Sequence, residues 1–160
     1  MNVIKKRAIL TYAISIAAAL AVGGLSALLS GDIMAQYRGY ALPPLAPPGW
    51  VFPLVWTALY ILMGISAAMV YLLGDGCTKD AMQVYALQLL LNLGWTVLFF
   101  GLDLLLAAFV WLVVLEAAIV IMIALFYALR PWAGILQIPY FLWVAFAGYL
   151  NLSIYLLNAP

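Results

Sequence analysis

The chain has 160 residues, of which 70% are hydrophobic and only 7% are charged. Soluble domains have roughly 45–50% apolar and about 25% charged residues, so the composition excludes a water-soluble domain and predicts a surface that mostly faces lipid. A net charge of +1 excludes the strong positive field that favours nucleic acid as a partner. The chain has no histidine and a single cysteine, Cys77. It therefore lacks the commonest metal and haem ligands and cannot form an internal disulfide, and we expect Cys77 to be an ordinary loop residue.

The first predicted transmembrane helix covers about residues 8–29, because a spanning helix needs about 20 mainly apolar residues. Three basic residues precede it and small residues lie within it, which is also the pattern of a cleaved signal peptide. Length argues against that alternative, since the apolar run exceeds the about 7–15 residues of a signal peptide.

A long connection, residues 30–46, follows the first span. Loops of this length in a compact bundle are often functional, for example as a lid. The connection leads into PPLAPPGW at residues 43–50, where the prolines stiffen the chain and suit the first turn of the next helix. We expect them to fix how the lid joins the second span, with Trp50 as an anchor at the membrane interface.

The second predicted span covers about residues 47–73. Pro53, Trp56 and Tyr60 follow one another at spacings of three and four, which places them on one helical face. Trp56 lies too far inside the span to fit the aromatic belt of a membrane interface. We therefore predict that Trp56 forms part of a pocket wall.

The third predicted span covers about residues 81–100, and Gln88, Asn92, Trp95 and Phe99 share one of its faces. Two amides in hydrocarbon must find hydrogen-bond partners or face a polar ligand. Both interpretations stay open from this pattern, since amides also join neighbouring transmembrane helices.

The fourth predicted span covers about residues 104–129 and contains Glu116, the one ionisable residue deep in a span. An intramembrane carboxyl is costly and by default suggests a function. The structural alternative is a protonated side chain that is hydrogen-bonded to a neighbouring helix. A single carboxyl without an ionisable partner is a poor proton relay.

The fifth predicted span covers about residues 132–157. Pro139 leaves the carbonyl of Ile135 without its helical donor and should kink this helix, which opens space in a small bundle. One face presents a series at helical spacing: Tyr140, Trp143, Ala147, and Leu150 or Asn151.

The five spans predict the fold class: an all-α integral membrane protein, a single-domain five-transmembrane-helix bundle with a long loop between helices 1 and 2. One side of the membrane holds five basic residues and the other holds only Arg38. By the positive-inside rule, we place the N-terminus in the cytoplasm, and the long loop and the C-terminus outside. The five are Lys5, Lys6, Arg7, Lys79 and Arg130.

Three stretches resemble the signatures of the TspO/MBR family, the translocator proteins: PPLAPPGWVFPLVWTALY (43–60), QLLLNLGWTVLFFG (88–101) and IPYFLWVAFAGYLN (138–151). The resemblance covers essentially the whole chain, and its rare residues at fixed spacing on three helices make it specific. It implies a bacterial-type member of the family in a cell membrane, often a homodimer, with a pocket under the first loop. The implied ligands are porphyrins such as protoporphyrin IX and haem, benzodiazepine- and isoquinoline-type drugs and, in mitochondrial members, cholesterol.

Carried over by motif, the resemblance implies ten ligand-binding residues: Pro47, Trp56, Tyr60, Gln88, Asn92, Trp95, Phe99, Trp143, Ala147 and Leu150. It implies no cofactor and no metal, because the porphyrin is itself the ligand. Without histidine, no imidazole can coordinate haem iron.

Two features depart from the family pattern. The cholesterol motif requires a basic residue after Leu150 and Tyr155, and none follows. The third span has no clean pair of small residues for a dimer face. Better series of small residues lie on the first span, at Ala13, Ala17 and Ala21, and on the second span, at Gly64 and Ala68. The sequence therefore does not decide which face would form a dimer.

The leading functional hypothesis is a membrane receptor or carrier for porphyrins. No acid–base or nucleophilic constellation is visible, so we assign no catalytic residue. One alternative is an enzyme that degrades porphyrin with light and oxygen, for which Trp56 and Trp143 would be the oxidisable rings. Another is a regulatory membrane protein whose partner contacts depend on ligand.

Overall fold

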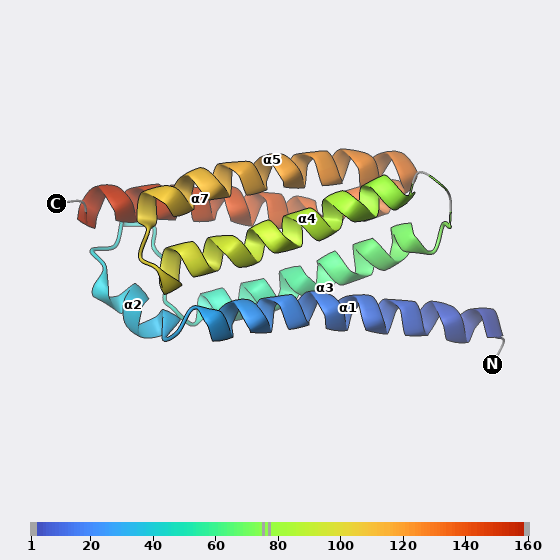
Figure 1. The fold of residues 1–160 in the computed structure, drawn as a ribbon, viewed down its shortest axis with the longest axis horizontal. Helices are drawn as coiled ribbons and strands as arrows, with labels where there is room; N and C mark the ends of the chain where they lie inside the picture. The colour runs from blue at the N-terminus through green and yellow to red at the C-terminus, as the bar shows by residue number, and fades with distance from the viewer. Residues whose placement is uncertain (1–2, 75, 77, 159–160) are drawn as a thin grey trace.

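The computed structural model describes residues 3–74, 76 and 78–158 and is all-helical over these ranges (Figure 1). Five helical segments are long and apolar enough to cross a membrane, which confirms the predicted fold class. The expectation about Cys77 falls outside the described residues. The helices are α1 (Val3–Leu29), α2 (Ile33–Gly39), α3 (Val51–Tyr71), α4 (Thr78–Thr96), the π-helix η1 (Val97–Gly101), α5 (Leu105–Leu129), α6 (Pro131–Ile135) and α7 (Ile138–Asn158).

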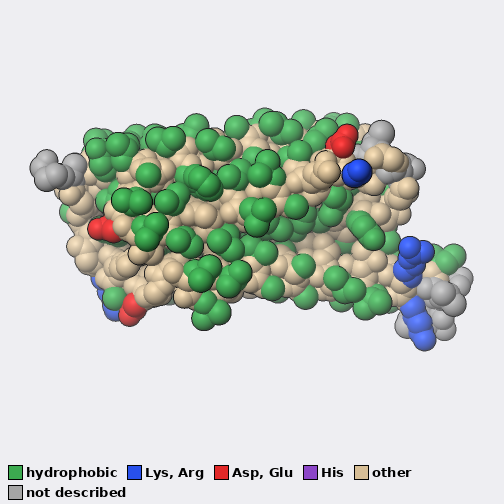
Figure 2. Space-filling view, in the orientation of Figure 1, with side chains coloured by type: hydrophobic (Ala, Val, Ile, Leu, Met, Phe, Trp, Pro, Cys, Tyr) green, Lys and Arg blue, Asp and Glu red, His purple; other side chains and the backbone are tan. Residues whose placement is uncertain are grey.

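The spans form a closed ring of neighbours. Helix α1 packs on α3 and α4, α3 packs on α6, and α5 packs on α4, α6 and α7. The two chain termini lie at opposite ends of the bundle (Figure 1). Figure 2 shows hydrophobic side chains along the length of the molecule and charged ones near its two ends, as a bilayer requires. The outer face therefore contacts lipid.

The starts of two helices differ most from the sequence-based expectation. The second span begins at Val51 rather than about Pro47, because Gly49 and Trp50 form a turn in which the Val51 amide bonds the Pro48 carbonyl at 3.0 Å. The first span begins earlier than expected, at Val3, so that its basic residues continue the helix beyond the apolar run. Apolar length thus predicted each crossing but not where its helix begins.

The predicted kink in the fifth span is confirmed as a break. Helix α6 ends at Ile135 and α7 begins at Ile138, so Pro139 is the second residue of α7. At that position its missing N–H costs no helical hydrogen bond.

Close contact between α1 and α3 depends on Gly64. A Cβ atom at Gly64 would lie 2.5 Å from the Ile16 Cα atom, which is closer than two carbon atoms can approach without a clash. Ala68, one turn further along α3, is fully buried. The Gly64–Ala68 pair, which the sequence offered as a possible dimer face, is therefore buried within the bundle, whereas Ala13, Ala17 and Ala21 stay exposed.

The long connection, residues 30–50, folds over one end of the bundle, and we call it the lid (Figure 1). Its helix α2 begins after Asp32, whose side chain accepts a hydrogen bond from the Ala35 amide at 2.9 Å. Such an N-cap stabilises a short helix by satisfying one of its free amides.

Three contacts attach the lid to the bundle. The Tyr37 ring packs edge-on against Phe52 of α3, with centroids 5.0 Å apart. The Tyr40 hydroxyl donates to the Asp103 carboxylate, in the turn before α5, at 2.7 Å. The side chain of Asn158, at the end of α7, bonds both the amide and the carbonyl of Ala41. The lid is thus tied to α3, to the turn before α5 and to α7.

The Tyr40 contact should make lid closure sensitive to alkaline pH. Burial, and then the hydrogen bond and negative charge of Asp103, raise the Tyr40 pKa well above its usual value near 10. A group whose pKa is raised in the folded state stabilises that state fully below the unfolded pKa and loses the effect as pH rises through the folded pKa. We expect lid cleavage by proteinase K to be slow at about pH 9 and to accelerate above about pH 10.

The Tyr40→Phe variant provides the control. It should be cleaved about fivefold faster at neutral pH, since a hydrogen bond to a charged group at a partly exposed site contributes about 1 kcal/mol. Its cleavage should also rise less between about pH 9 and about pH 11. Buried Tyr37, whose pKa is also raised by burial, supplies the remaining rise. An identical pH profile in the two proteins would show that Tyr40 does not secure the lid.

Candidate ligand-binding site

A cavity of about 350 Å³ lies between α1, α3, the α4–η1 span and α2. This volume is within the range of small-molecule sites, and such sites are mostly apolar with few polar groups. The lining is largely aliphatic and aromatic: Leu20, Gly23, Gly24, Ser26, Ala27, Ile33, Met34, Phe52, Pro53, Trp56, Thr57, Tyr60, Trp95, Thr96 and Phe100. We call this space the cavity.

Trp56 is the centre of the aromatic wall of the cavity. Its ring lies 5.7 Å from that of Tyr60, 6.1 Å from Trp95 and 6.3 Å from Tyr140, measured between centroids. These separations are those of favourable aromatic pairs. The structure therefore brings Trp56, Tyr60 and Trp95, from two spans, into one wall, as a pocket requires.

Helix α1 closes the cavity on the opposite side through small residues. A Cβ atom at Gly23 would lie 2.3 Å from the Tyr60 ring, so only glycine allows that ring to lie against α1. Sequence reasoning missed this contribution of α1. The signal was the Gly23–Gly24 pair inside an apolar helix. Glycine lowers helix stability by about 1 kcal/mol relative to alanine, so its presence there often indicates close packing against another segment.

The Ser26 side chain supplies an unused polar group in the wall. It is 3% exposed, and its hydroxyl oxygen has no hydrogen-bond partner in the described part of the chain. Ser26 lies one turn before the end of α1, beside the lid. A polar group of a ligand near this end would meet a free hydroxyl.

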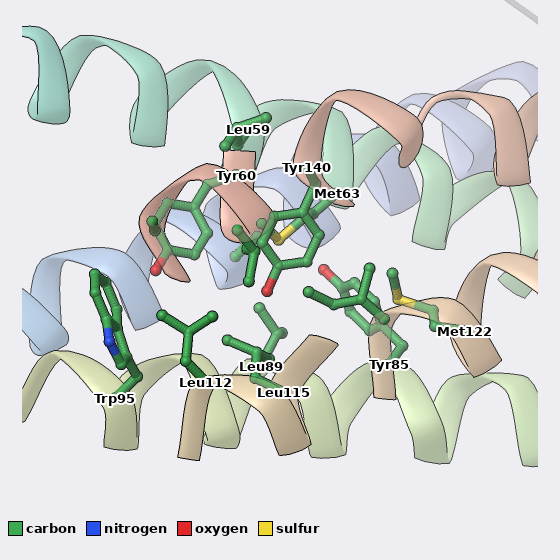
Figure 3. Close-up of a cluster of buried hydrophobic side chains, with 14 of the residues drawn as sticks. Leu59, Tyr60, Met63, Tyr85, Leu89, Trp95, Leu112, Leu115, Met122 and Tyr140 are labelled. Atoms are coloured by element: carbon green, nitrogen blue, oxygen red, sulfur yellow. The ribbon is translucent and has the colours of Figure 1, made fainter. Parts of the chain in front are cut away.

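Asn92 and Gln88 lie behind the aromatic wall, in a buried network that joins three helices. The Asn92 amide oxygen accepts from the Tyr60 hydroxyl at 2.7 Å, and its nitrogen donates to Tyr140 at 3.1 Å. The Tyr140 hydroxyl donates in turn to Gln88 at 2.8 Å. Figure 3 shows Tyr60 and Tyr140 with their hydroxyl ends inside the buried cluster, and Trp95 beside them. These contacts favour the helix-joining interpretation of the two amides.

The Asn92→Leu variant should destabilise the bundle and loosen Tyr60. Each interhelical hydrogen bond in a membrane protein contributes about 1 kcal/mol, and this change removes both bonds of Asn92. A double-mutant cycle with Tyr60→Phe, measured by unfolding in detergent, isolates the shared bond. Strict additivity of the two single changes would mean that the Tyr60–Asn92 bond contributes nothing to stability.

Phe99, Ala147 and Leu150 line a second, much smaller space. This void of about 20 Å³ lies next to the cavity and shares Phe52, Trp95 and Phe100 with it. The three shared aromatic rings therefore form a partition between the two spaces. Their rotation would join the predicted residues of α7 to the cavity.

The π-helix explains why two consecutive phenylalanines both point inward. In η1 the Leu102 amide bonds the Val97 carbonyl at 2.9 Å, five residues earlier. Phe99 and Phe100 are 3% and 6% exposed, and their rings lie 4.6 Å apart. Sequence reasoning missed Phe100 because regular helical spacing places only one of two adjacent residues on a given face. Such π-turns occur frequently at functional sites.

Trp143 and Pro47 do not line the cavity as it stands. The Trp143 ring packs edge-on against Phe52 at 6.1 Å, behind the partition, and its indole nitrogen is buried without a partner among the described residues. The Pro47 carbonyl accepts the Tyr37 hydroxyl at 2.9 Å, so this residue holds the lid. Direct ligand contact by either residue stays a prediction.

Glu116 lies away from the cavity, in a groove between α5 and α7. Neither of its carboxyl oxygens has a hydrogen-bond partner among the described residues. The bond to a neighbouring helix that the structural alternative required is therefore not formed among the described residues, because the facing positions of α7 carry small or apolar side chains such as Ala145 and Gly148. Within the described residues, no group of three histidine, cysteine or acidic side chains could hold a metal ion.

The model of the TspO/MBR family matches residues 13–157. The chain belongs to the TspO/MBR family. Within this family it is similar to the tryptophan-rich protein TspO of Chlorobaculum tepidum, with 41% identity over 94% of this chain and 97% of that protein. The tryptophan-rich sensory protein of Cereibacter sphaeroides is 40% identical over 70% of each chain. The translocator protein of Homo sapiens is 32% identical over 81% of this chain and 79% of that protein.

Family membership confirms the resemblance found in the sequence. The part of the chain that matches the family model, residues 13–157, includes all three signature stretches. The signatures contribute differently to the geometry. Those at 43–60 and 88–101 form the aromatic wall. The one at 138–151 contributes Tyr140, whose ring packs on Trp56, and places Ala147 and Leu150 at the small void.

Proposed function

We propose that this protein is a membrane receptor or carrier that binds a flat aromatic ligand of the porphyrin class in the cavity. The observation that carries the proposal is the aromatic wall centred on Trp56, which faces a cavity within the transmembrane bundle. Stacking on such rings favours flat, apolar, polarisable molecules. Benzodiazepine- and isoquinoline-type aromatic compounds fit the same chemistry.

The Ser26 hydroxyl suggests how such a ligand would be oriented. Protoporphyrin IX has an apolar macrocycle and two carboxylates on one edge. With the macrocycle against Trp56, the carboxylate edge would lie toward the lid, where Ser26 offers its unpaired hydroxyl. A hydrogen bond to a charged group is worth about 1.5–3 kcal/mol, so this contact would contribute substantially to affinity.

Two matched ligands test the orientation. Purified protein should bind metal-free protoporphyrin IX at least about tenfold more tightly than its dimethyl ester. Ser26→Ala should remove most of that difference and leave the affinity for the ester unchanged. Equal binding of acid and ester by the native protein would contradict the orientation. Absence of measurable binding by either ligand would contradict the proposed function itself.

The names of the relatives suggest two roles, translocation and sensing. A carrier would release protoporphyrin IX across a liposome membrane at a rate that depends on the protein, whereas a receptor would bind it without flux. Equilibrium binding and flux should be measured on the same preparation. Flux that Trp56→Leu abolishes would assign the carrier role.

A second candidate is light-dependent porphyrin breakdown. The specific observation in its favour is that Trp56, an oxidisable ring, forms the cavity wall against which a photosensitiser would stack. More than one turnover per protein in light and oxygen, lost in Trp56→Phe and absent in the dark, would support an enzyme. Bleaching that is equal in both proteins would exclude a role for Trp56.

We also propose the orientation and the assembly. Lys5 and Lys6 lie in the first turns of α1 and Lys79 lies at the start of α4. The starts of these two helices lie toward the same end of the bundle (Figure 1). The positive-inside rule places this end in the cytoplasm and the lid outside. For a homodimer, the exposed face of α1 with Ala13, Ala17 and Ala21 offers small residues that allow close helix approach.

A further inference from the structure

A groove on the lipid-facing side of the bundle is lined in part by Glu116, whose two carboxyl oxygens are buried and unpartnered among the described residues. The groove has a volume of about 410 Å³ and lies between α5 and α7. Residues at its edges face outward, with Val113 55% and Tyr149 41% exposed. We call it the Glu116 groove, defined by Leu112, Val113, Glu116, Val120, Gly148 and Leu152. It is distinct from the cavity, with which it shares no lining residue.

The carboxyl of Glu116 is an unusual group at this depth. Glu116 is near the middle of α5, roughly 16–20 Å from either helix end at about 1.5 Å per residue. Both of its oxygens are buried and lack a partner among the described residues. A polar group in hydrocarbon without a hydrogen bond costs several kcal/mol. A molecule in the groove that bonds these oxygens, once the Glu116 side chain turns toward the groove, would recover part of that cost.

The position of the carboxyl limits what this molecule can be. Phospholipid headgroups lie at the interface, about 15 Å from the bilayer centre, and do not reach Glu116. The occupant must be soluble in hydrocarbon and compact enough for the groove. It must also satisfy both oxygens, which a base can do by taking up the carboxyl proton and then donating N–H hydrogen bonds to the resulting carboxylate.

We propose that the Glu116 groove is a second ligand site, which binds a compact lipophilic amine through the Glu116 carboxyl. An amine fits better than an alcohol, because it can take up the proton of the carboxyl. The resulting ammonium ion compensates the carboxylate charge and donates to it. Gly148 leaves the floor of the groove open: a Cβ atom there would meet only Leu112, at 3.7 Å.

Two probes of the same shape test the site, 1-adamantylamine and 1-adamantanol. Calorimetric binding is measured on the full chain in lipid nanodiscs, with empty nanodiscs as the blank for partitioning into lipid. The amine should bind the native protein at least about tenfold more tightly than the alcohol. Glu116→Gln, which keeps the shape of the side chain, should remove this difference. Gly148→Leu should fill the groove and weaken both probes.

A stability measurement separates a binding role from a structural one. Glu116→Leu should raise the melting temperature by removing the unpaired carboxyl, and it should abolish amine binding. If the variant instead melts lower than the native protein, Glu116 is a structural residue and the proposal fails. Equal amine affinity in native protein and Glu116→Gln would overturn it as well.

A second copy of the chain is the competing occupant. In a Cys77→Ser background, Val113→Cys reports contact between two grooves as a disulfide-linked dimer. The proposal expects no efficient cross-linking at Val113 in nanodiscs that hold several copies. Rapid cross-linking that the amine does not inhibit would identify the groove as a dimer face and overturn the proposal.

Discussion

Replacing Gly64 by leucine should push α1 away from α3 and abolish ligand binding in the cavity. A Cβ atom at this position would lie 2.5 Å from the Cα and 2.7 Å from the backbone nitrogen of Ile16. Backbone atoms cannot move aside as a side-chain tip can, so the two helices must separate. Overpacking of this kind costs about 3 kcal/mol or more.

The cavity makes this change functional as well as structural. Helix α1 supplies one wall through Leu20, Gly23 and Ala27, and α3 supplies the other through Trp56 and Tyr60. Separating the helices widens the cavity, so that a ligand stacked on α3 loses its contacts with α1. We expect a lower melting temperature and no measurable protoporphyrin IX binding.

The matched control is Ala58→Leu, on the same helix. Ala58 is exposed to the lipid side and does not line the cavity, so a larger apolar side chain there should change neither stability nor binding. Similar behaviour of Gly64→Leu and Ala58→Leu would show that α1 does not pack through Gly64.

Replacing Trp56 by leucine should weaken protoporphyrin IX binding by about twofold to tenfold. The indole contacts three other rings. It is also the largest aromatic side chain of α3 that lines the cavity. Aromatic stacking contributes about 0.5–1.5 kcal/mol beyond the area that it buries, and each 1.4 kcal/mol is a factor of ten in affinity. Leucine keeps the site apolar and removes the stacking.

The measurement should follow the absorbance of the porphyrin rather than tryptophan fluorescence, because the change itself removes a fluorophore. Trp132→Leu is the control: this indole is 68% exposed and lies in α6, outside the cavity lining. Native affinity in Trp56→Leu would place the ligand elsewhere in the molecule. An equal loss in both variants would indicate a general effect on the bundle.

The partition between the cavity and the small void bears on both experiments. The partition of Phe52, Trp95 and Phe100 lies between the cavity, which Trp56 lines, and the void lined by Ala147 and Leu150. Trp143 packs on the Phe52 ring and lines neither space. A ligand larger than the cavity must rotate these rings, and it would then contact the fifth span. The predicted pairing of Trp56 and Trp143 around a single macrocycle therefore depends on side-chain movement rather than on the arrangement seen here.

The sequence by itself determined the number and nature of the spans. Five apolar segments of sufficient length must form helices in a bilayer, since backbone groups in lipid have to be bonded within their own segment. The break before Pro139 followed from local chemistry, because proline lacks the amide that a continuous helix requires. The aromatic face of α3 followed from helical periodicity.

Only the tertiary structure decided which faces meet and what lies between them. Asn92 and Gln88 have the same spacing whether they bind a ligand or join helices, and it was the placement of Tyr60 and Tyr140 beside them that paired the amides internally. Gly23, Ser26 and Phe100 entered the cavity through the packing of α1 and the π-turn of η1. The reason is that helical spacing fixes which side chains share a face, whereas the partner of that face is set by close approach between segments distant in the chain.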